Sequence, residues 1–463
     1  MDRPNILFLM SDEHRFDVAG FAGNDVVRTP VLDSLARDGV VFNNAYTPSP
    51  ICIPGRQAMM SGQFPRTCNC EKFGQDLAPN TMTFANRFSQ YAYQTCVSGK
   101  LHHVGRDQMQ GWNMRVAPDM FVNEKFIEGR VEEEFKKYPA WHSRWKWSDV
   151  TEVHRAHAED DSRNQRFDRN ATAALGEFIE DYFLDMTYDR ATPNRPVMMK
   201  LSLLQPHYPY VATRERLIYY FNRVKPFLDE PVFDHPFLGQ RSIKVEEEAT
   251  PREIRRATAA YYGMVEAVDT HFGQTLDALR NVGQNLDDWI IIYTTDHGEM
   301  LGEHGIWEKQ KFFEGSARVP LIIRYPKRFK PRVVNENVNL CDIFATLCDL
   351  AGIPTPGGLD SRSMVPLMNG DSHAWRTRYR NETVSQFGAR NLMIKQDDLK
   401  YHWYGSDVPE VLFDLKNDPK ERRNAIDDPA HAIRVKEFRD RRDELGFAPE
   451  GKGDYVNAGY GNE

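Results

Sequence analysis

The 463-residue sequence contains little cysteine and no long apolar run. Its six cysteines show no paired C-x-x-C spacing, which argues against a zinc site of that type and favours reduced thiols. No apolar segment approaches the roughly 18 residues of a membrane-spanning helix. The apolar run at residues 5–10 is also too short for the core of a secretory signal. We therefore expect a cytoplasmic protein without a membrane partner.

An excess of positive charge is also missing. The formal net charge is -8, which argues against a surface devoted to nucleic acid or to an anionic membrane. Any anion site must therefore be local. The chain is 41% hydrophobic and 27% charged, a composition typical of globular proteins that excludes a collagen-like, coiled-coil or disordered chain.

Short apolar runs alternate with helical patterns along most of the chain. The run at 5–10 is continuous rather than alternating, which is typical of a strand buried in a parallel sheet. This alternation predicts an α/β fold with a large, mixed but mostly parallel sheet flanked by helices. The predicted strands are 5–10, 40–42, 93–98, 197–204, 289–295 and 319–325, and the clearest predicted helices are 29–39, 252–281 and 339–351.

The character of the sequence changes near residue 360, after a Pro- and Gly-rich stretch. We expect a catalytic α/β domain over 1–360 and a smaller α+β subdomain over 361–463, with short strands and a last charged helix. Residues 117–169 are aromatic and charged without clean periodicity, and we interpret them as an insertion near the pocket. The alternative is a surface excursion with its own small core. This insertion includes Trp141, Trp145 and Trp147.

Two predicted strands end directly in residues that ligate metals. Asp12 and Glu13 follow the first strand, and Asp296 and His297 follow the strand at 289–295. Open α/β sheets bind ligands at the carboxyl ends of their strands. Carboxylate oxygens with one imidazole nitrogen suit a divalent transition metal better than an all-oxygen calcium cage. The alternatives are solvated loops, a helix cap for the acids and a merely hydrogen-bonded histidine.

A cysteine lies where a helix is predicted to begin. Cys52 opens the segment Cys-Ile-Pro-Gly-Arg, and Arg56 follows one helical turn later. A nucleophile at a helix N-terminus gains from the partial positive charge there. The alternative for a single cysteine in a loop is a small buried hydrophobe.

Five cationic or potentially cationic residues follow or lie near predicted strand ends or the Cys52 segment. Gathered around one centre, they would form an anion pocket in a protein of net negative charge. Taken one by one, they are equally compatible with surface lysines and hydrogen-bonded histidines. The five are Arg56, Lys100, His102, His207 and Lys309.

Together these motifs resemble the type I sulfatases of the alkaline phosphatase superfamily. Cys-x-Pro-x-Arg at 52–56 is the signature of that family, read by the enzyme that oxidises the cysteine to formylglycine. The resemblance implies an alkaline phosphatase-like fold, a maturing formylglycine-generating enzyme as partner and an aldehyde hydrate at position 52. It extends over the stretches 4–12, 29–39, 52–62, 98–102, 206–207, 296–309, 313–320 and 412–421.

The resemblance also implies roles for the candidate residues. One hydroxyl of the hydrated aldehyde attacks sulfur, and the second then expels sulfate by reforming the aldehyde, a route that serine lacks. Arg56 and Lys100 orient the hydrate, His102 assists the elimination, and His207 with Lys309 binds the sulfuryl group and protonates the leaving oxygen. The implied ligands of one divalent metal ion are Asp12, Glu13, modified Cys52, Asp296 and His297.

Two departures from the common family pattern refine these expectations. Glu13 stands where relatives have Asp or Gln. His297 stands where many sulfatases have Asn, which resembles the branch of choline sulfatases and phosphonate monoester hydrolases and favours Mn²⁺, with Ca²⁺ as the alternative.

The pair Lys100 and His102 favours hydrolysis of a small sulfate ester over a phosphonate monoester or phosphodiester, because the other hydrolases of this branch tend to have neutral hydroxyl residues there. Choline, a sugar and an aryl alcohol stay open as leaving groups. A non-catalytic anion-binding relative is a further alternative, and relatives of the branch often form dimers or tetramers.

Overall fold

The computed structural model describes residues 3–120, 150–184, 195–240 and 242–447. Its centre is a mixed sheet of nine strands in the order β11-β2-β10-β8-β1-β6-β3-β4, with β9 paired to β2. Five of the strand pairs are parallel, and only the pairs made by β9 and β10 are antiparallel. The strands are β1 Ile6–Ser11, β2 Val40–Tyr46, β3 Gln94–Gly99, β4 Met114–Ala117, β6 Val197–Ser202, β8 Ile290–Thr295, β9 Arg318–Val319, β10 Leu321–Arg324 and β11 Arg332–Asn339.

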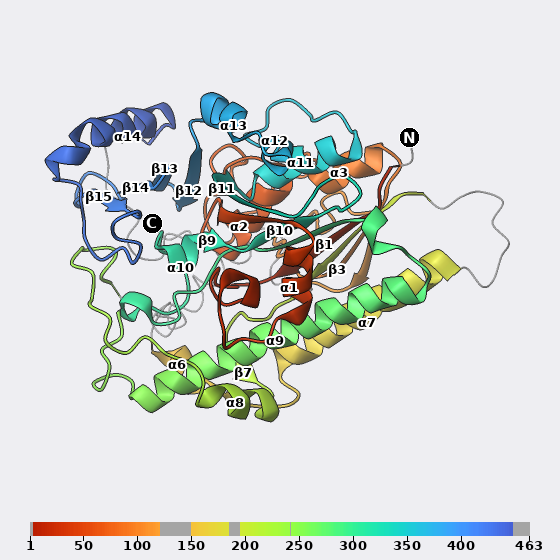
Figure 1. The fold of residues 1–463 in the computed structure, drawn as a ribbon, viewed down its shortest axis with the longest axis horizontal. Coiled ribbons are helices and arrows are strands. Elements are labelled where there is room, and N and C mark those ends of the chain that lie inside the picture. The colour runs from red at the N-terminus through yellow and green to blue at the C-terminus, as the bar shows by residue number, and fades with distance from the viewer. Residues whose placement is uncertain (1–2, 121–149, 185–194, 241, 448–463) are drawn as a thin grey trace.

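Helices cover both faces of this sheet, as Figure 1 shows. On one face α2, α3, α11 and α12 enclose an apolar core, and on the other α1, α7 and α9 enclose a second core. The predicted α/β class is therefore confirmed, and the two cores explain why β1 is buried at every residue. These helices are α1 Pro30–Arg37, α2 Cys52–Ser61, α3 Phe84–Gln90, α7 Arg163–Leu184, α9 Pro251–Asn281, α11 Asp342–Ala351 and α12 Val365–Asn369.

The predicted elements lie within a few residues of the observed ones, and α1 begins as predicted at Thr29 and Pro30. Thr29 occupies the N-cap position and Pro30 the first helical turn. The Thr29 hydroxyl does not cap the helix; it donates to Asp33 Oδ1 at 3.0 Å and accepts from the Gly20 amide at 2.8 Å. Bonds to the Asp33 side chain of the same helix and to the Gly20 amide have thus replaced the capping bond.

The C-terminal region forms a second sheet, antiparallel, in the order β12-β13-β14-β15. A buried ionic contact joins it to the part of the chain that forms the main sheet: Lys400 Nζ lies 2.8 Å from Glu314 Oε1, and it also pairs with Glu421 of the C-terminal region. The elements of this region are α13 Ser372–Tyr379, β12 Glu382–Phe387, β13 Asn391–Gln396, β14 Leu399–Trp403, β15 Val411–Asp414 and α14 Ala432–Glu444. The smaller elements elsewhere are α6 Thr151–Arg155, β5 His157–Ala158, β7 Val211–Ala212, α8 Arg214–Phe221 and α10 Glu314–Ala317.

The predicted insertion at 117–169 is only partly described. Residues 121–149, including the three tryptophans, lie outside the described residues. The part that follows forms α6, β5 and the first turns of α7, whose apolar face packs on the main sheet.

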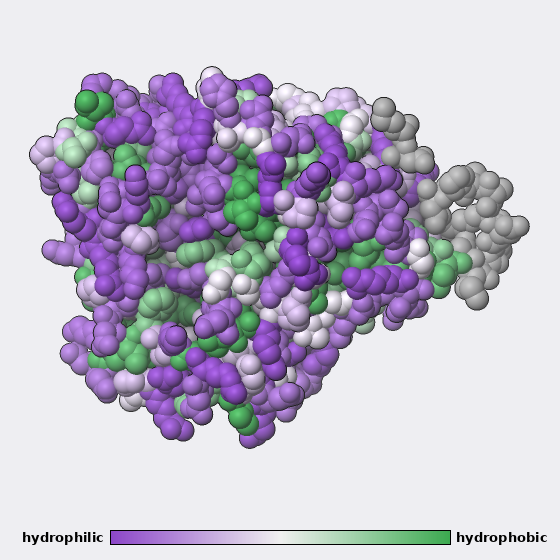
Figure 2. All heavy atoms as spheres, in the orientation of Figure 1, coloured by the Kyte–Doolittle hydropathy of each residue, from purple (hydrophilic) through white to green (hydrophobic). Residues whose placement is uncertain are grey.

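The surface in the orientation of Figure 2 is mostly hydrophilic, and its apolar residues gather across the middle of that face. Among the described residues, no helix combines the length and the apolar character that crossing a bilayer requires.

Candidate active site

The register of the main sheet brings the predicted site residues to one edge. Strand β1 pairs in parallel with both β8 and β6, so that Ser11 lies opposite Thr295 and Met10 opposite Ser202. Asp12 and Asp296 are the residues that follow, and they therefore emerge side by side from neighbouring strands. Strand β3 pairs with β6 at Gly99 and Ser202, which adds the segment beginning at Lys100 to the same edge.

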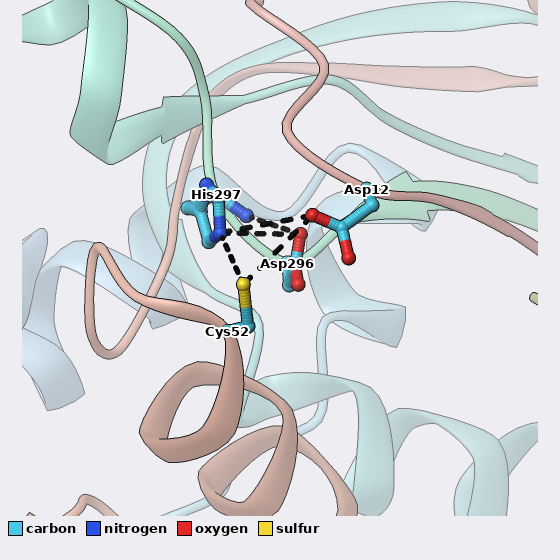
Figure 3. A group of neighbouring side chains, drawn as sticks. All are labelled: Asp12, Cys52, Asp296 and His297. Atoms are coloured by element: carbon cyan, nitrogen blue, oxygen red, sulfur yellow. Dashed lines mark hydrogen bonds and ion pairs between the residues drawn. The ribbon is translucent and has the colours of Figure 1, made fainter. Parts of the chain in front are cut away.

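Cys52 is the first residue of α2, as predicted, and its side chain points toward this edge (Figure 3). The thiol is buried, with only 2% of the residue exposed. Its Sγ lies 3.1 Å from His297 Nε2 and 3.9 Å from Asp12 Oδ1. The helix therefore presents the predicted nucleophile position directly to the acidic strand ends.

Four side chains form a compact cluster that is able to hold one metal ion. One ligand atom each from Asp12, Cys52, Asp296 and His297 lies within 4.8 Å of the other three, and all four residues are buried (Figure 3). His297 Nδ1 donates to the Gly298 carbonyl at 3.0 Å, so the lone pair of Nε2 faces the cluster. Two carboxylates and a correctly oriented imidazole are a donor set that fits a divalent transition metal.

The turn that carries these ligands has no room for a side chain after His297. A Cβ at Gly298 would lie 2.0 Å from the Gly315 carbonyl oxygen, and the Gly298 amide donates to the Ser316 carbonyl at 2.8 Å. The close approach fixes the turn against α10, which explains why glycine follows the Asp-His pair.

The Arg56 guanidinium bridges the carboxylates of Asp12 and Asp296. Its Nη2 donates to Asp12 Oδ2 at 2.9 Å and its Nε to Asp296 Oδ2 at 2.7 Å, while Nη1 donates to the Lys100 carbonyl at 2.9 Å. The ammonium of Lys100 also pairs with Asp12. Burial opposes ionisation of Asp12, yet Lys100 and Arg56 together hold the pKa of that carboxyl well below its usual range.

A second group, around Glu13, contains Lys309 and His207. Lys309 Nζ lies 2.8 Å from His207 Nε2, 2.6 Å from Glu13 Oε2 and 4.3 Å from the centre of the Tyr208 ring. His207 Nδ1 donates to the Tyr208 carbonyl at 2.7 Å, which leaves Nε2 to accept from Lys309. Burial and the charge of Lys309 hold the pKa of His207 well below its usual value, so the imidazole is neutral.

His102 lies in the loop after β3 with Lys100. Its amide and that of Leu101 donate to Asp119 Oδ2 at 2.8 and 3.1 Å, and its ring meets the edge of Phe73 at a centroid distance of 5.5 Å. Burial and the nearby charge of Lys100 hold the pKa of His102 well below its usual value. The imidazole of His102 is therefore neutral at neutral pH.

Three buried carboxylates that sequence reasoning did not single out position these loops. Asp168 of α7 accepts from the Leu204 and Gln205 amides at 2.6 and 3.1 Å, just before His207. Asp119 holds the loop of His102, and Asp76 accepts from His103 Nδ1 at 3.0 Å. Of the three, only Asp119 could have been noticed in the sequence, because it closely follows the short strand β4. Asp168 and Asp76 lie far in sequence from the loops that they hold.

The unmodified Cys52 thiol is a poor nucleophile in this environment. Burial, followed by the negative charge of Asp12, raises its pKa to about 12. A thiol of this kind stays protonated at neutral pH, which argues against chemistry by the thiolate itself.

This pKa predicts slow alkylation of Cys52 in protein made without a maturing enzyme. With a thiol pKa of about 12, roughly one molecule in ten thousand carries the thiolate at pH 8, against roughly a quarter of free cysteine. We expect iodoacetamide to label Cys52 roughly a thousand times more slowly than free cysteine, with a rate that rises about tenfold per pH unit, because higher pH removes the thiol proton. Peptide mass spectrometry measures the rates, with guanidinium-unfolded protein as the control. Labelling at the speed of free cysteine would contradict the assigned environment.

Taken together, Cys52 at a helix start, a buried cluster of two carboxylates and an imidazole, and the side chains of Arg56, Lys100, His207 and Lys309 meet at the carboxyl edge of a mostly parallel sheet. Fold and site define a hydrolase of the alkaline phosphatase superfamily. The profile of the sulfatase family matches residues 4–353, and one described as N-sulphoglucosamine sulphohydrolase, C-terminal, matches residues 302–446. The chain belongs to the sulfatase family and is a sulfuric ester hydrolase.

Curated relatives carry the same assignment. The choline-sulfatase of Rhizobium meliloti is 29% identical, covering 95% of this chain and 86% of that protein. The arylsulfatase of Clostridium perfringens is 28% identical, with 94% and 92% covered. Arylsulfatase K of Danio rerio is 30% identical, with 91% and 80% covered.

Solved structures share the fold. The phosphonate monoester hydrolase of Agrobacterium radiobacter superposes with a TM-score of 0.76 at 24% identity, covering 96% of this chain and 95% of that one. BT4656, in complex with its substrate D-glucosamine-2-N,6-O-disulfate, superposes with a TM-score of 0.74 at 20% identity, with 96% and 97% covered.

Proposed function

We propose that this sulfuric ester hydrolase acts through a formylglycine at position 52 and releases an alcohol and inorganic sulfate. The observation that carries the proposal is the position of Cys52 at the start of α2, 3.1 Å from His297 Nε2 and beside two buried carboxylates. The family signature around Cys52 supports oxidation by a formylglycine-generating enzyme. The hydrated aldehyde supplies two hydroxyls on one carbon, one to attack sulfur and one to expel sulfate.

Asp12, Asp296, His297 and the modified residue 52 would hold one divalent ion. Bound there, the ion supplies Lewis acidity to the nucleophile and to the sulfuryl oxygens. The single imidazole among these ligands favours Mn²⁺ over Ca²⁺.

The other residues of the site bind the substrate and transfer protons. Lys100 and Arg56 flank position 52 and pair with the buried carboxylates. Their positive charges offset the negative charges that would otherwise repel an anionic substrate. Burial opposes the charge of Lys309, yet Glu13, Glu308 and Asp12 act together to raise the pKa of the ammonium, so that Lys309 keeps its proton. We assign to Lys309, with His207 beside it, the proton that the leaving oxygen takes up. Neutral His102 accepts the proton released when sulfate is expelled.

A phosphonate monoester or phosphodiester hydrolase is the second candidate function. It is favoured by His297 in the ligand cluster and by the fold shared with phosphonate monoester hydrolases. Lys100 and His102 argue against this second function. Both are buried beside the cluster, where Lys100 supplies a positive charge to the bound anion and His102 supplies a neutral base.

One preparation tests both candidates. Protein is made together with a formylglycine-generating enzyme, its position-52 peptide is examined by mass spectrometry, and kcat/KM is compared for aryl, choline and sugar sulfates and for phenyl phosphonates with Mn²⁺ added. We expect the aldehyde and a higher kcat/KM for a sulfate ester. A higher kcat/KM for a phosphonate supports the second candidate, and an unmodified thiol together with turnover would overturn the mechanism.

The metal preference gives a separate prediction. His297→Asn replaces an imidazole nitrogen by an amide oxygen and moves the ligand set toward the all-oxygen sites that calcium prefers. We expect Mn²⁺ to bind the variant about 10 to 100 times more weakly while Ca²⁺ binding changes little. Isothermal titration of metal-free protein measures both, with His304→Asn, a buried histidine outside the cluster, as the control. An unchanged order of metal affinities would contradict the assignment of His297 as a ligand.

A further inference from the structure

The ring of Tyr208 lies against both residues to which we assign the leaving-group proton. Its centroid is 4.1 Å from that of the His207 imidazole, with an angle of 35° between the two planes, and 4.3 Å from Lys309 Nζ. His207 Nε2 and Lys309 Nζ are themselves 2.8 Å apart. One aromatic side chain therefore contacts the imidazole and the ammonium at the same time.

The contact bears on where the ammonium of Lys309 is held. Lysine has a long, flexible side chain, so the position of its nitrogen depends on the groups that surround it. Nζ lies at hydrogen-bond distance from His207 Nε2 and Glu13 Oε2, and the face of the Tyr208 ring is a further contact. An ammonium over an aromatic face is attracted by the electrons of the ring, and more strongly when it is buried, as Lys309 is.

A buried aromatic group supports the Tyr208 ring. Tyr208 is half-buried and packs on the core that contains Tyr210 and Trp307. The ring of Tyr210 lies 6.4 Å from that of Tyr208 and 5.4 Å from that of Trp307, measured between centroids. Trp307 precedes Lys309 by two residues, so the same aromatic group carries the His207 segment and the Lys309 segment.

The backbone orients His207 independently of the Tyr208 side chain. His207 Nδ1 donates to the Tyr208 carbonyl at 2.7 Å, and the His207 carbonyl accepts from Asn164 Nδ2 at 3.2 Å. Both bonds use backbone atoms of the segment, which a substitution at position 208 leaves in place. Such a substitution therefore tests the ring by itself.

We propose that the ring of Tyr208 positions Lys309 and His207 at the leaving oxygen of the substrate. Tyr208 is a positioning residue in this assignment, because it acts through Lys309 and His207 and not on the reacting atoms. The inference rests on the proposed function, in which Lys309, with His207 beside it, supplies the leaving-group proton. Because one ring holds both groups, its removal frees both members of the pair.

The proposal predicts a loss of rate that depends on the leaving group. Esters of acidic phenols need little protonation as they leave, whereas esters of aliphatic alcohols need a positioned acid. For Tyr208→Leu we expect kcat to fall by less than about fivefold for 4-nitrophenyl sulfate and by on the order of a hundredfold for an alkyl sulfate. KM should change by less than about threefold for both esters, because the ring does not bind the substrate. Tyr208→Phe keeps the ring and should stay within about threefold of wild type.

The kinetic experiment measures kcat and KM for a series of aryl and alkyl sulfates in matched variants. Tyr182→Leu, at a half-buried tyrosine of α7 that packs on the other core, is the control and should keep wild-type kinetics. Lys309→Met should show the same steeper leaving-group dependence as Tyr208→Leu. The double variant Tyr208→Leu with Lys309→Met should lose little more than Lys309→Met alone, because the ring acts through the ammonium.

Crystal structures of wild type, Tyr208→Phe and Tyr208→Leu give a readout that needs no turnover. We expect the 2.8 Å contact between Lys309 Nζ and His207 Nε2 to persist in Tyr208→Phe and to be lost in Tyr208→Leu. If Tyr208→Leu folds poorly, Tyr208→Met, which replaces the ring by a longer aliphatic chain, takes its place in every measurement.

Three results would overturn the proposal. An equal fall in kcat for all leaving groups would indicate a general structural role for Tyr208. A rise in KM at unchanged kcat would indicate that the ring contacts the substrate instead. Retention of the contact between Lys309 and His207 in Tyr208→Leu would show that other groups hold the pair. Failure of the proposed function is distinguishable, because wild type would then turn over no sulfate ester while the crystal structures still decide whether Tyr208 holds Lys309.

Discussion

Cys52→Ala is expected to abolish hydrolysis of sulfate esters while leaving the fold intact. Residue 52 begins α2 and its side chain points at the metal-type cluster, so its removal takes away the atom that we propose to be modified and to attack. Loss of a covalent nucleophile lowers kcat by about four orders of magnitude or more. Truncation of one buried sulfur costs about 1 kcal/mol, so the unfolding transition should shift little.

The measurement compares kcat for 4-nitrophenyl sulfate and the thermal unfolding midpoint in matched variants. Cys348→Ala, in α11, also removes a buried sulfur, yet that sulfur lies in the apolar core, so activity should be kept. Cys52→Ser should be as inactive as the alanine variant, because a single hydroxyl lacks the second oxygen that expels sulfate. A kcat within tenfold of wild type in Cys52→Ala would contradict a mechanism that uses residue 52 as the nucleophile.

Arg56→Met is expected to damage both activity and stability. Its guanidinium is fully buried and donates to Asp12 and Asp296 at once, so the variant leaves two buried carboxylates short of a partner. Breaking a buried ion pair in this way costs about 3–5 kcal/mol of unfolding free energy. We also expect kcat/KM to fall on the order of a hundredfold or more, because charge near the sulfuryl oxygens is lost.

The loss of unfolding free energy in Arg56→Met should depend on pH in a definite direction. Arg56 helps to hold the pKa of Asp12 below its usual range, so its contribution to stability is present above the unfolded pKa near 3.8 and is lost as the pH falls further. The stability gap between Arg56→Met and wild type should therefore narrow at low pH. Urea titrations at pH 7 and at about pH 3, below that unfolded pKa, measure it, with Arg223→Met at an exposed position as the control. An equal gap at both pH values would contradict the charge-pairing role.

Arg56→Lys separates charge from geometry. Lysine restores one positive charge but lacks the planar fork that reaches both carboxylates. We expect a loss of stability between those of wild type and Arg56→Met, since one of the two carboxylates regains a partner.

Much of the fold followed from local patterns. The continuous apolar run at 5–10 predicted a buried parallel strand, and β1 lies between β6 and β8 in the middle of the sheet. The predicted helix at Cys52 and its spacing to Arg56 are confirmed by α2. Thr29 shows the limit of such reasoning, because its hydroxyl binds the Asp33 carboxylate and the Gly20 amide instead of capping its own helix.

By itself the sequence determined the class of fold, the start of a helix at Cys52 and the acids at the strand ends. These are properties of short segments, set by periodicity, by helix spacing and by the rule that parallel strands end at one edge. Only the tertiary structure decided which acid serves which cation. Glu13 and Lys309 meet across 296 residues of chain, and Asp119 and Asp168 hold loops that they do not belong to. Such pairings depend on distances between buried atoms of different elements, and no local pattern encodes those distances.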